Sequence, residues 1–149
     1  MNFCTFLASG LGIGYAPKAP GTFGSLLGLA LGMALLAAGH MPLLLGIIVA
    51  TGLGIWAISR LPEHAGNDPR WIVIDEIAGQ MIPLLALSQL SFTGALLAFA
   101  LFRLFDIWKP GPVAWADQHH DELGIMGDDL IAGLLAFAVL FLIRLVTPL

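Results

Sequence analysis

The sequence has 149 residues, of which 58% are hydrophobic and only 11% are charged, and its mean hydropathy is +0.92. Soluble globular domains are roughly 45–50% apolar and about 25% charged, so this composition excludes a water-soluble domain of this size. We expect one domain, residues 1–149, of the all-α integral membrane class. The net charge of −4 matters less than where the charges lie, because all ten carboxylates fall within residues 60–76 and 103–129.

The N-terminal residues 1–22 are apolar but interrupted. They lack the basic segment of a secretory signal peptide, and glycines at 10, 12 and 14 and Pro17 break the apolar run. We expect this segment to belong to the mature protein, where it spans, re-enters or lies on the membrane. Cys4 is the single cysteine, so no internal disulfide can form.

Five longer apolar runs follow, and we expect four to five transmembrane or re-entrant helices from them. The first two runs are roughly 17 residues each, which is close to the minimum for crossing the hydrocarbon. The third is short for a crossing and contains Pro83. In chain order the runs cover residues 23–39, 43–59, 77–90, 94–105 and 130–146.

Counting each run as one crossing predicts which segments share a face of the membrane. Residues 16–22, 60–76 and 103–129 then lie together, while the opposite connections carry no charged residue. Of the six basic residues, only Arg144 lies toward the other face. The positive-inside rule therefore makes the shared face cytoplasmic, as in a bacterial inner-membrane protein. If residues 77–90 re-enter instead of crossing, the two acidic windows lie on opposite sides.

Residues 10–25 are rich in glycine and proline and could bind an anion. Thr22 or Ser25 would cap the helix that starts there, and exposed backbone N–H groups together with Lys18 would favour a phosphate. The alternative is a hinge that leads into a capped helix. The segment is not a Walker A loop, because no Gly-Lys-Ser/Thr follows the glycines.

Asp75 and Glu76 are adjacent carboxylates between apolar residues at the mouth of a predicted helix. Removing an unpaired carboxylate from water is costly, so such a pair indicates a bound cation. Hard divalent ions such as Mg²⁺ take oxygen ligands of this kind. The alternative is that both acids simply favour a helix N-terminus through its dipole.

Arg103, Asp106 and Lys109 are spaced three apart, which places them on one helix face until Pro110 stops the helix. A carboxylate between two cations suits a metal–phosphate site; the alternative is a structural ladder of ion pairs.

Asp128 and Asp129 are expected to open the last helix, where one of them could be an N-cap. We interpret the remaining acids and the loop containing His119 and His120 as solvated. These acids are Glu63, Asp68, Asp117, Asp121 and Glu122.

Together these segments resemble the phosphatidylglycerophosphatase A family of bacterial membrane enzymes. The matching stretches run from Pro17 to Ser25, from Ile74 to Gly79, from Phe102 to Pro110 and from Gly124 to Asp129. The resemblance implies a Mg²⁺-dependent phosphatase that converts phosphatidylglycerophosphate to phosphatidylglycerol at the cytoplasmic face. It implies a phospholipid substrate, and we expect neither nucleic acid nor an obligate protein partner.

On this hypothesis five carboxylates serve the metal and the chemistry, and the cations with the Gly-rich segment hold the phosphate. The predicted metal ligands are Asp75, Glu76, Asp106, Asp128 and Asp129, with Lys109 as a further catalytic residue. The predicted substrate-binding residues are Lys18, Thr22, Ser25, Arg103 and Lys109. Asp106 could instead act as an acid–base group or as a nucleophile.

Two other function classes remain open at this point. A divalent-cation transporter would place acids near the middle of several helices, whereas these acids gather at helix ends. A lipid phosphotransferase of the CDP-alcohol type would carry an Asp-Gly-x-x-Ala-Arg pattern, which is absent.

Overall fold

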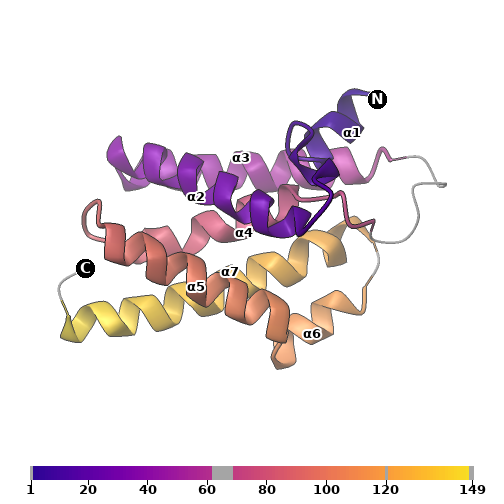
Figure 1. The fold of residues 1–149 in the computed structure, drawn as a ribbon. Coiled ribbons are helices and arrows are strands. Elements are labelled where there is room, and N and C mark those ends of the chain that lie inside the picture. Colours follow the sequence, from indigo (N-terminus) through magenta and orange to yellow (C-terminus); the bar gives the residue numbers. More distant parts are fainter. Residues whose placement is uncertain (1, 62–68, 120, 148–149) are drawn as a thin grey trace.

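The computed structural model describes residues 2–61, 69–119 and 121–147, and every regular element in these ranges is helical. This confirms the all-α prediction (Figure 1). The α-helices are α1 (Phe3–Ala8), α2 (Pro20–Ala37), α3 (His40–Ile58), α4 (Ile74–Met81), α5 (Phe92–Trp108), α6 (Gly111–Asp117) and α7 (Glu122–Val146). Two 3₁₀ helices, η1 (Ile13–Tyr15) and η3 (Ile82–Ala86), complete the fold.

Among the described residues, α2, α3 and α7 are long and apolar enough to cross a membrane. The apolar helix α5, with 17 residues, is one residue shorter than α2. These helices lie side by side along the long dimension of the molecule (Figure 1). Their outward faces are apolar, with large side chains such as Leu45, Ile48 and Leu142 more than half exposed. A helical bundle with this surface is membrane-associated.

The centre of the bundle is a broken helix made of α4 and η3. It packs against α2, α3, α5 and α7, and Glu76 is the one residue of α4 that is not buried. Pro83 lies at the start of η3, where its missing N–H favours the change from α to 3₁₀ geometry. At about 1.5 Å per residue in α4 and about 2.0 Å per residue in η3, the broken helix is roughly 22 Å long. This is less than the ~30 Å of a bilayer's hydrocarbon core.

The described parts of both acidic windows meet at one end of the bundle. The starts of α2, α4 and α7 and the ends of α3 and α5 lie there together with α6 (Figure 1). This is the arrangement expected if residues 77–90 pass through the bundle rather than turn back. At the other end, Arg144 donates a hydrogen bond of 2.9 Å to the carbonyl oxygen of Ala86, the last residue of η3.

Two predicted helix starts are wrong. Helix α2 begins at Pro20, with left-handed backbone at Ala19 and no side-chain cap, so Thr22 and Ser25 lie inside its first turns. A proline at the first helical position is favourable because the N–H it lacks would have no partner. Helix α7 begins at Glu122, capped by Asp121, whose side chain accepts a 2.8 Å hydrogen bond from the Gly124 N–H. Asp128 and Asp129 are therefore inside α7 and are not its N-cap.

Close helix approaches at glycines set the position of α4. A Cβ on Gly28 of α2 would lie 2.6 Å from the carbonyl oxygen of Ile77, and a Cβ on Gly79 would lie 2.6 Å from the carbonyl oxygen of Asp129 in α7. Small residues let helix backbones approach this closely in membrane proteins. The contact at Gly79 brings the Asp129 segment of α7 alongside α4, one turn after Asp75.

Candidate active site

A polar cleft of about 310 Å³ lies at the end of the bundle where the acidic windows meet. It is lined by residues from α2, α4, α5, α6 and α7 and from the segments before α4, after α5 and after α6. Seven predicted site residues line it, namely Asp75, Glu76, Arg103, Asp106, Lys109, Asp128 and Asp129. The fold thus joins groups that lie more than fifty residues apart in sequence.

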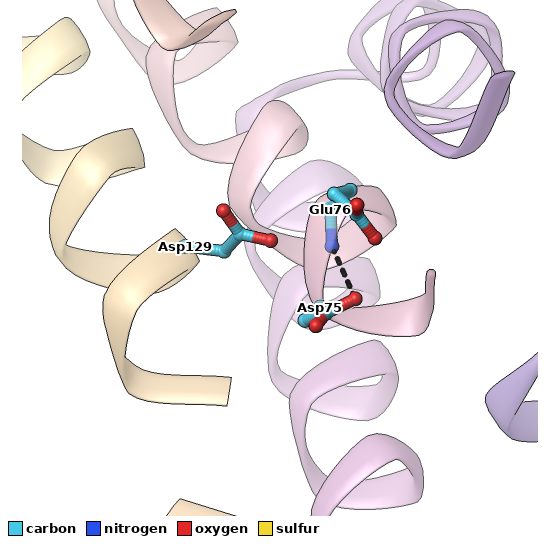
Figure 2. Close-up of side chains that lie close together, drawn as sticks. All are labelled: Asp75, Glu76 and Asp129. Carbon is cyan, nitrogen blue, oxygen red and sulfur yellow. Dashed lines mark hydrogen bonds between the residues drawn. The ribbon is translucent and has the colours of Figure 1, made fainter. Parts of the chain in front are cut away.

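Three of the carboxylates form a compact group. Asp75 and Glu76 come from the first turn of α4, and Asp129 reaches toward them from α7 (Figure 2). One oxygen from each lies within 4.8 Å of the others. Asp75 also accepts a 2.9 Å hydrogen bond from the N–H of Glu76 (Figure 2). Asp75 and Asp129 are buried, with 7% and 4% of their surface exposed.

The acidic group contains oxygens that lack protein donors. Glu76 Oε2 and Asp129 Oδ1 are buried and have no hydrogen-bond partner among the described residues, and the same holds for both amide atoms of Gln80. Like charges this close destabilise one another unless a cation lies among them. Buried carboxylates of this kind are stabilised by a positive partner or by protonation, and a set of oxygen ligands fits Mg²⁺.

The first residues of α2 pack against the three-carboxylate group and carry no charge themselves. A Cβ on Gly21 would overlap Glu76 Oε1, and the Arg103 guanidinium would be 3.5 Å away. A side chain at position 21 would therefore displace the Glu76 carboxylate. Gly21 and Pro20 line the cleft, so the predicted Gly-rich segment does border the site, through its backbone.

Arg103 is held by partners on two helices. Its Nη1 lies 2.5 Å from Asp106 Oδ2 and donates a 3.3 Å hydrogen bond to Ser25 Oγ. Ser25 is fully buried and donates in turn to the Gly21 carbonyl oxygen at 2.9 Å. Ser25 does not line the cleft, so it contributes to the site by holding Arg103 in position.

Lys109 pairs with different acids from those we predicted. Its Nζ lies 2.7 Å from Asp128 Oδ2 and also contacts Asp117 Oδ1, so the expectation that Asp106 lies between two cations is wrong. The reason is that Lys109 has left-handed backbone, with φ of 49°, and ends α5, so its side chain leaves the helix face. Burial alone lowers the Lys109 pKa, but hydrogen bonds to Asp117 and Asp128 outweigh it and raise that pKa above its usual value.

Two further predicted substrate-binding residues are absent from the cleft lining. Lys18 is exposed just before α2, and Thr22 is half-buried in the first turn of that helix. Their contact with a substrate stays a prediction.

Three cleft residues with polar side chains were not predicted. Asp117 is not a solvated loop acid, because it ends α6 and pairs with Lys109; the Pro110–Pro112 segment, which favours a helix start, was the available signal. Arg70 and His119 also border the cleft, and no spacing in the sequence indicates them. Glu63, Asp68 and His120 lie outside the described residues.

Comparison with known proteins identifies the kind of enzyme to which this site belongs. A family model described as phosphatidylglycerophosphatase A matches residues 6–144. The chain belongs to the phosphatidylglycerophosphatase A family. This membership confirms the resemblance seen in the sequence, and it makes the chain a phosphatase rather than a cation transporter or a phosphotransferase.

Individual relatives align along almost the whole chain. Phosphatidylglycerophosphatase A of Haemophilus influenzae is 40% identical over 147 residues, which cover 97% of this chain and 90% of the relative. The Escherichia coli protein of the same name is 32% identical over 139 residues, covering 92% and 81%. A Bacteroides thetaiotaomicron protein named "Putative phosphatidylinositol-3-phosphatase" is 37% identical over 145 residues, covering 93% and 91%. No solved structure matches the chain.

Proposed function

We propose that this protein is a Mg²⁺-dependent phosphatase that removes the terminal phosphate of phosphatidylglycerophosphate and leaves phosphatidylglycerol. The observation that carries the proposal is the juxtaposition, in one cleft, of three clustered carboxylates, two of them buried, with two cations held by their own acids. A phosphatase needs both features, because the reacting phosphate must be bound and its developing charge must be offset.

Asp75, Glu76 and Asp129 would hold the metal ion. Mg²⁺ bound there would supply positive charge to phosphate oxygens and lower the pKa of a bound water. Arg103 and Lys109 would bind the phosphate oxygens through charge-assisted hydrogen bonds. In this proposal Asp106 and Asp128, which we also predicted as ligands, orient Arg103 and Lys109 through the ion pairs that they form.

Metal removal tests the proposal on the unmodified protein. We expect the purified protein in detergent to release phosphate from phosphatidylglycerophosphate, to lose that activity in EDTA and to regain it when Mg²⁺ is added in excess. Phosphatidylinositol 3-phosphate is assayed in parallel, because one relative is named for that substrate. Activity that survives EDTA would contradict the metal proposal. Preference for the inositol lipid would contradict the proposed substrate.

We further propose that the protein crosses the bacterial inner membrane several times with the cleft facing the cytoplasm. The support is that Lys18, Arg60, Arg70, Arg103 and Lys109 lie toward the cleft end, whereas Arg144 lies toward the other. Basic residues are enriched on the cytoplasmic side of membrane proteins.

Two exposed glutamines at opposite ends allow a matched test of this orientation. Gln118 follows α6 at the cleft end, and Gln89 lies between η3 and α5 at the other end. In a Cys4→Ser background, we expect a membrane-impermeant maleimide to label Gln89→Cys in intact spheroplasts. Gln118→Cys should be labelled only after the membrane is disrupted. The reverse pattern would refute the cytoplasmic placement.

A further inference from the structure

A second hollow lies between α2 and α5, on the lipid-facing side of the bundle. This groove has a volume of about 590 Å³, and Ser91 is the one residue with a polar side chain in its lining. Its walls are built by Leu26, Leu29, Ala30 and Met33 of α2 and by Phe92, Ala95, Leu96 and Phe99 of α5. Such a groove fits a flexible hydrocarbon chain better than a polar ligand.

The groove leads to the polar cleft along both of its helices. On α5, Phe92, Leu96 and Phe99 are followed at three- to four-residue spacing by Arg103 and Asp106, which line the cleft. Residues at this spacing share a helix face. On α2 the same spacing leads from Leu26 to Thr22, beside the cleft residues Pro20 and Gly21.

The distance from the polar cleft to the far end of the groove is close to the depth of one leaflet of a bilayer. Phe92 and Arg103 are eleven residues apart on one helix, which corresponds to about 16 Å at 1.5 Å per residue. The hydrocarbon core of a bilayer is about 30 Å thick, so one leaflet is about half of that. The α5 residues of the groove, Phe92 to Phe99, lie in the part of this distance farther from Arg103, so a lipid with its phosphate beside Arg103 would place the terminal part of its chain in the groove.

A second apolar groove, between α2 and α3, is a poorer match. It has a volume of about 340 Å³ and is lined by residues such as Leu31, Ala34, Val49 and Leu53. Helix α3 contributes no residue to the lining of the polar cleft, whereas α2 and α5 both do. Helix α4 lines this groove and also the cleft. Leu7 and Leu11 also line this groove, so the segment around α1 lies along it.

We propose that the α2–α5 groove is an acyl-chain subsite, which holds one fatty acyl chain of the phospholipid whose phosphate occupies the cleft. This inference rests on the proposed function and adds to it the way in which the lipid is seated. Membrane lipid is as apolar as the groove, so burial provides little driving force. The groove instead fixes the orientation of the chain, and with it the position of the phosphate relative to Arg103 and the acidic group.

Filling the groove tests the proposal. Ala30 lines the α2–α5 groove and Ala34, one turn later on the same helix, lines the α2–α3 groove; both are exposed. The measured quantity is kcat/KM for dipalmitoyl-phosphatidylglycerophosphate divided by kcat/KM for the dihexanoyl form. We expect Ala30→Phe to lower this ratio about tenfold, a usual size for a change in an apolar pocket. Ala34→Phe should leave the ratio within about twofold.

Each outcome decides between the two grooves. An unchanged ratio in Ala30→Phe, a ratio lowered instead by Ala34→Phe, or a wild-type enzyme indifferent to chain length would overturn the acyl-chain subsite. A wild-type protein that releases no phosphate from either lipid would instead refute the proposed function.

Photolabelling of the wild type makes the test independent of how the variants fold. A phosphatidylglycerophosphate analogue with a diazirine at the end of one chain should form adducts in α5 near Phe92 and Leu96. Adducts in α3 near Val49 and Leu53 would place the chain in the other groove and overturn the proposal.

Discussion

Replacing Asp129 by asparagine is expected to lower phosphate release from phosphatidylglycerophosphate by at least about a hundredfold. A bound metal ion supplies several kcal/mol of charge stabilisation, and each 1.4 kcal/mol is about a tenfold change in rate. Asp129 provides one of three clustered carboxylates, and its Oδ1 has no protein donor among the described residues. The asparagine would keep the shape of the side chain but lose the charge that holds a cation.

Thermal unfolding separates loss of metal binding from loss of fold. In the wild type we expect Mg²⁺ to raise the unfolding temperature, since a ligand that binds the folded state stabilises it. Asp129→Asn should unfold at or above the wild-type temperature in EDTA, because it removes one of several buried like charges. Its unfolding temperature should not respond to Mg²⁺.

Asp121→Asn is the matched control for this variant. It makes the same chemical change near the start of α7, and asparagine is as good a helix cap as aspartate. Asp121 does not line the cleft, so near wild-type activity is expected. Equal loss of activity in both variants, or a normal Mg²⁺ response in Asp129→Asn, would remove Asp129 from the metal site.

The second large effect is expected from Gly79→Ala. The added methyl would lie 2.6 Å from the carbonyl oxygen of Asp129 and 2.8 Å from Phe102 Cε2, so α4 and α7 must separate. Overpacking of this kind typically costs about 1–3 kcal/mol. Because the same contact holds Asp129 against Asp75 and Glu76, we also expect at least about a tenfold loss of activity.

Gly52→Ala provides the comparison for Gly79→Ala. Gly52 lies in α3, and a Cβ there would have no neighbour within 4 Å. The substitution should stabilise the protein by roughly 0.5–1 kcal/mol through helix propensity alone. Unfolding temperature and phosphate release are measured for both variants. If Gly79→Ala is as harmless as Gly52→Ala, close packing of α4 on α7 does not position the site.

The sequence was most informative where charge is rare. In a chain with 11% charged residues, Asp75, Arg103 and Asp129 stand out against apolar neighbours, and all three line the cleft. The long apolar runs also predicted that the main elements are helices. Family membership, suggested by the order of the motifs, is confirmed by comparison.

Local geometry was harder to predict. Whether Lys109 faces Asp106 or Asp128 depends on one left-handed residue at the end of α5, and a non-glycine residue gives no sequence signal for that conformation. Asp117 was misread because the short α6, which presents it to Lys109, has too few turns to show a periodic pattern. Ser25 acts through Arg103 from the interior of α2, and only the packing of α2 on α5 reveals that contact.

The central position of α4 has a consequence for how the protein is made. Helix α4 carries two acids and is too short to cross a bilayer by itself, and it becomes covered only when α5 and α7 pack around it. The Asp129 carboxylate that completes the acidic group belongs to α7, which leaves the ribosome after all the other described helices. The site is therefore assembled last, and a partly synthesised chain in the membrane lacks the carboxylate that would let it hold a metal.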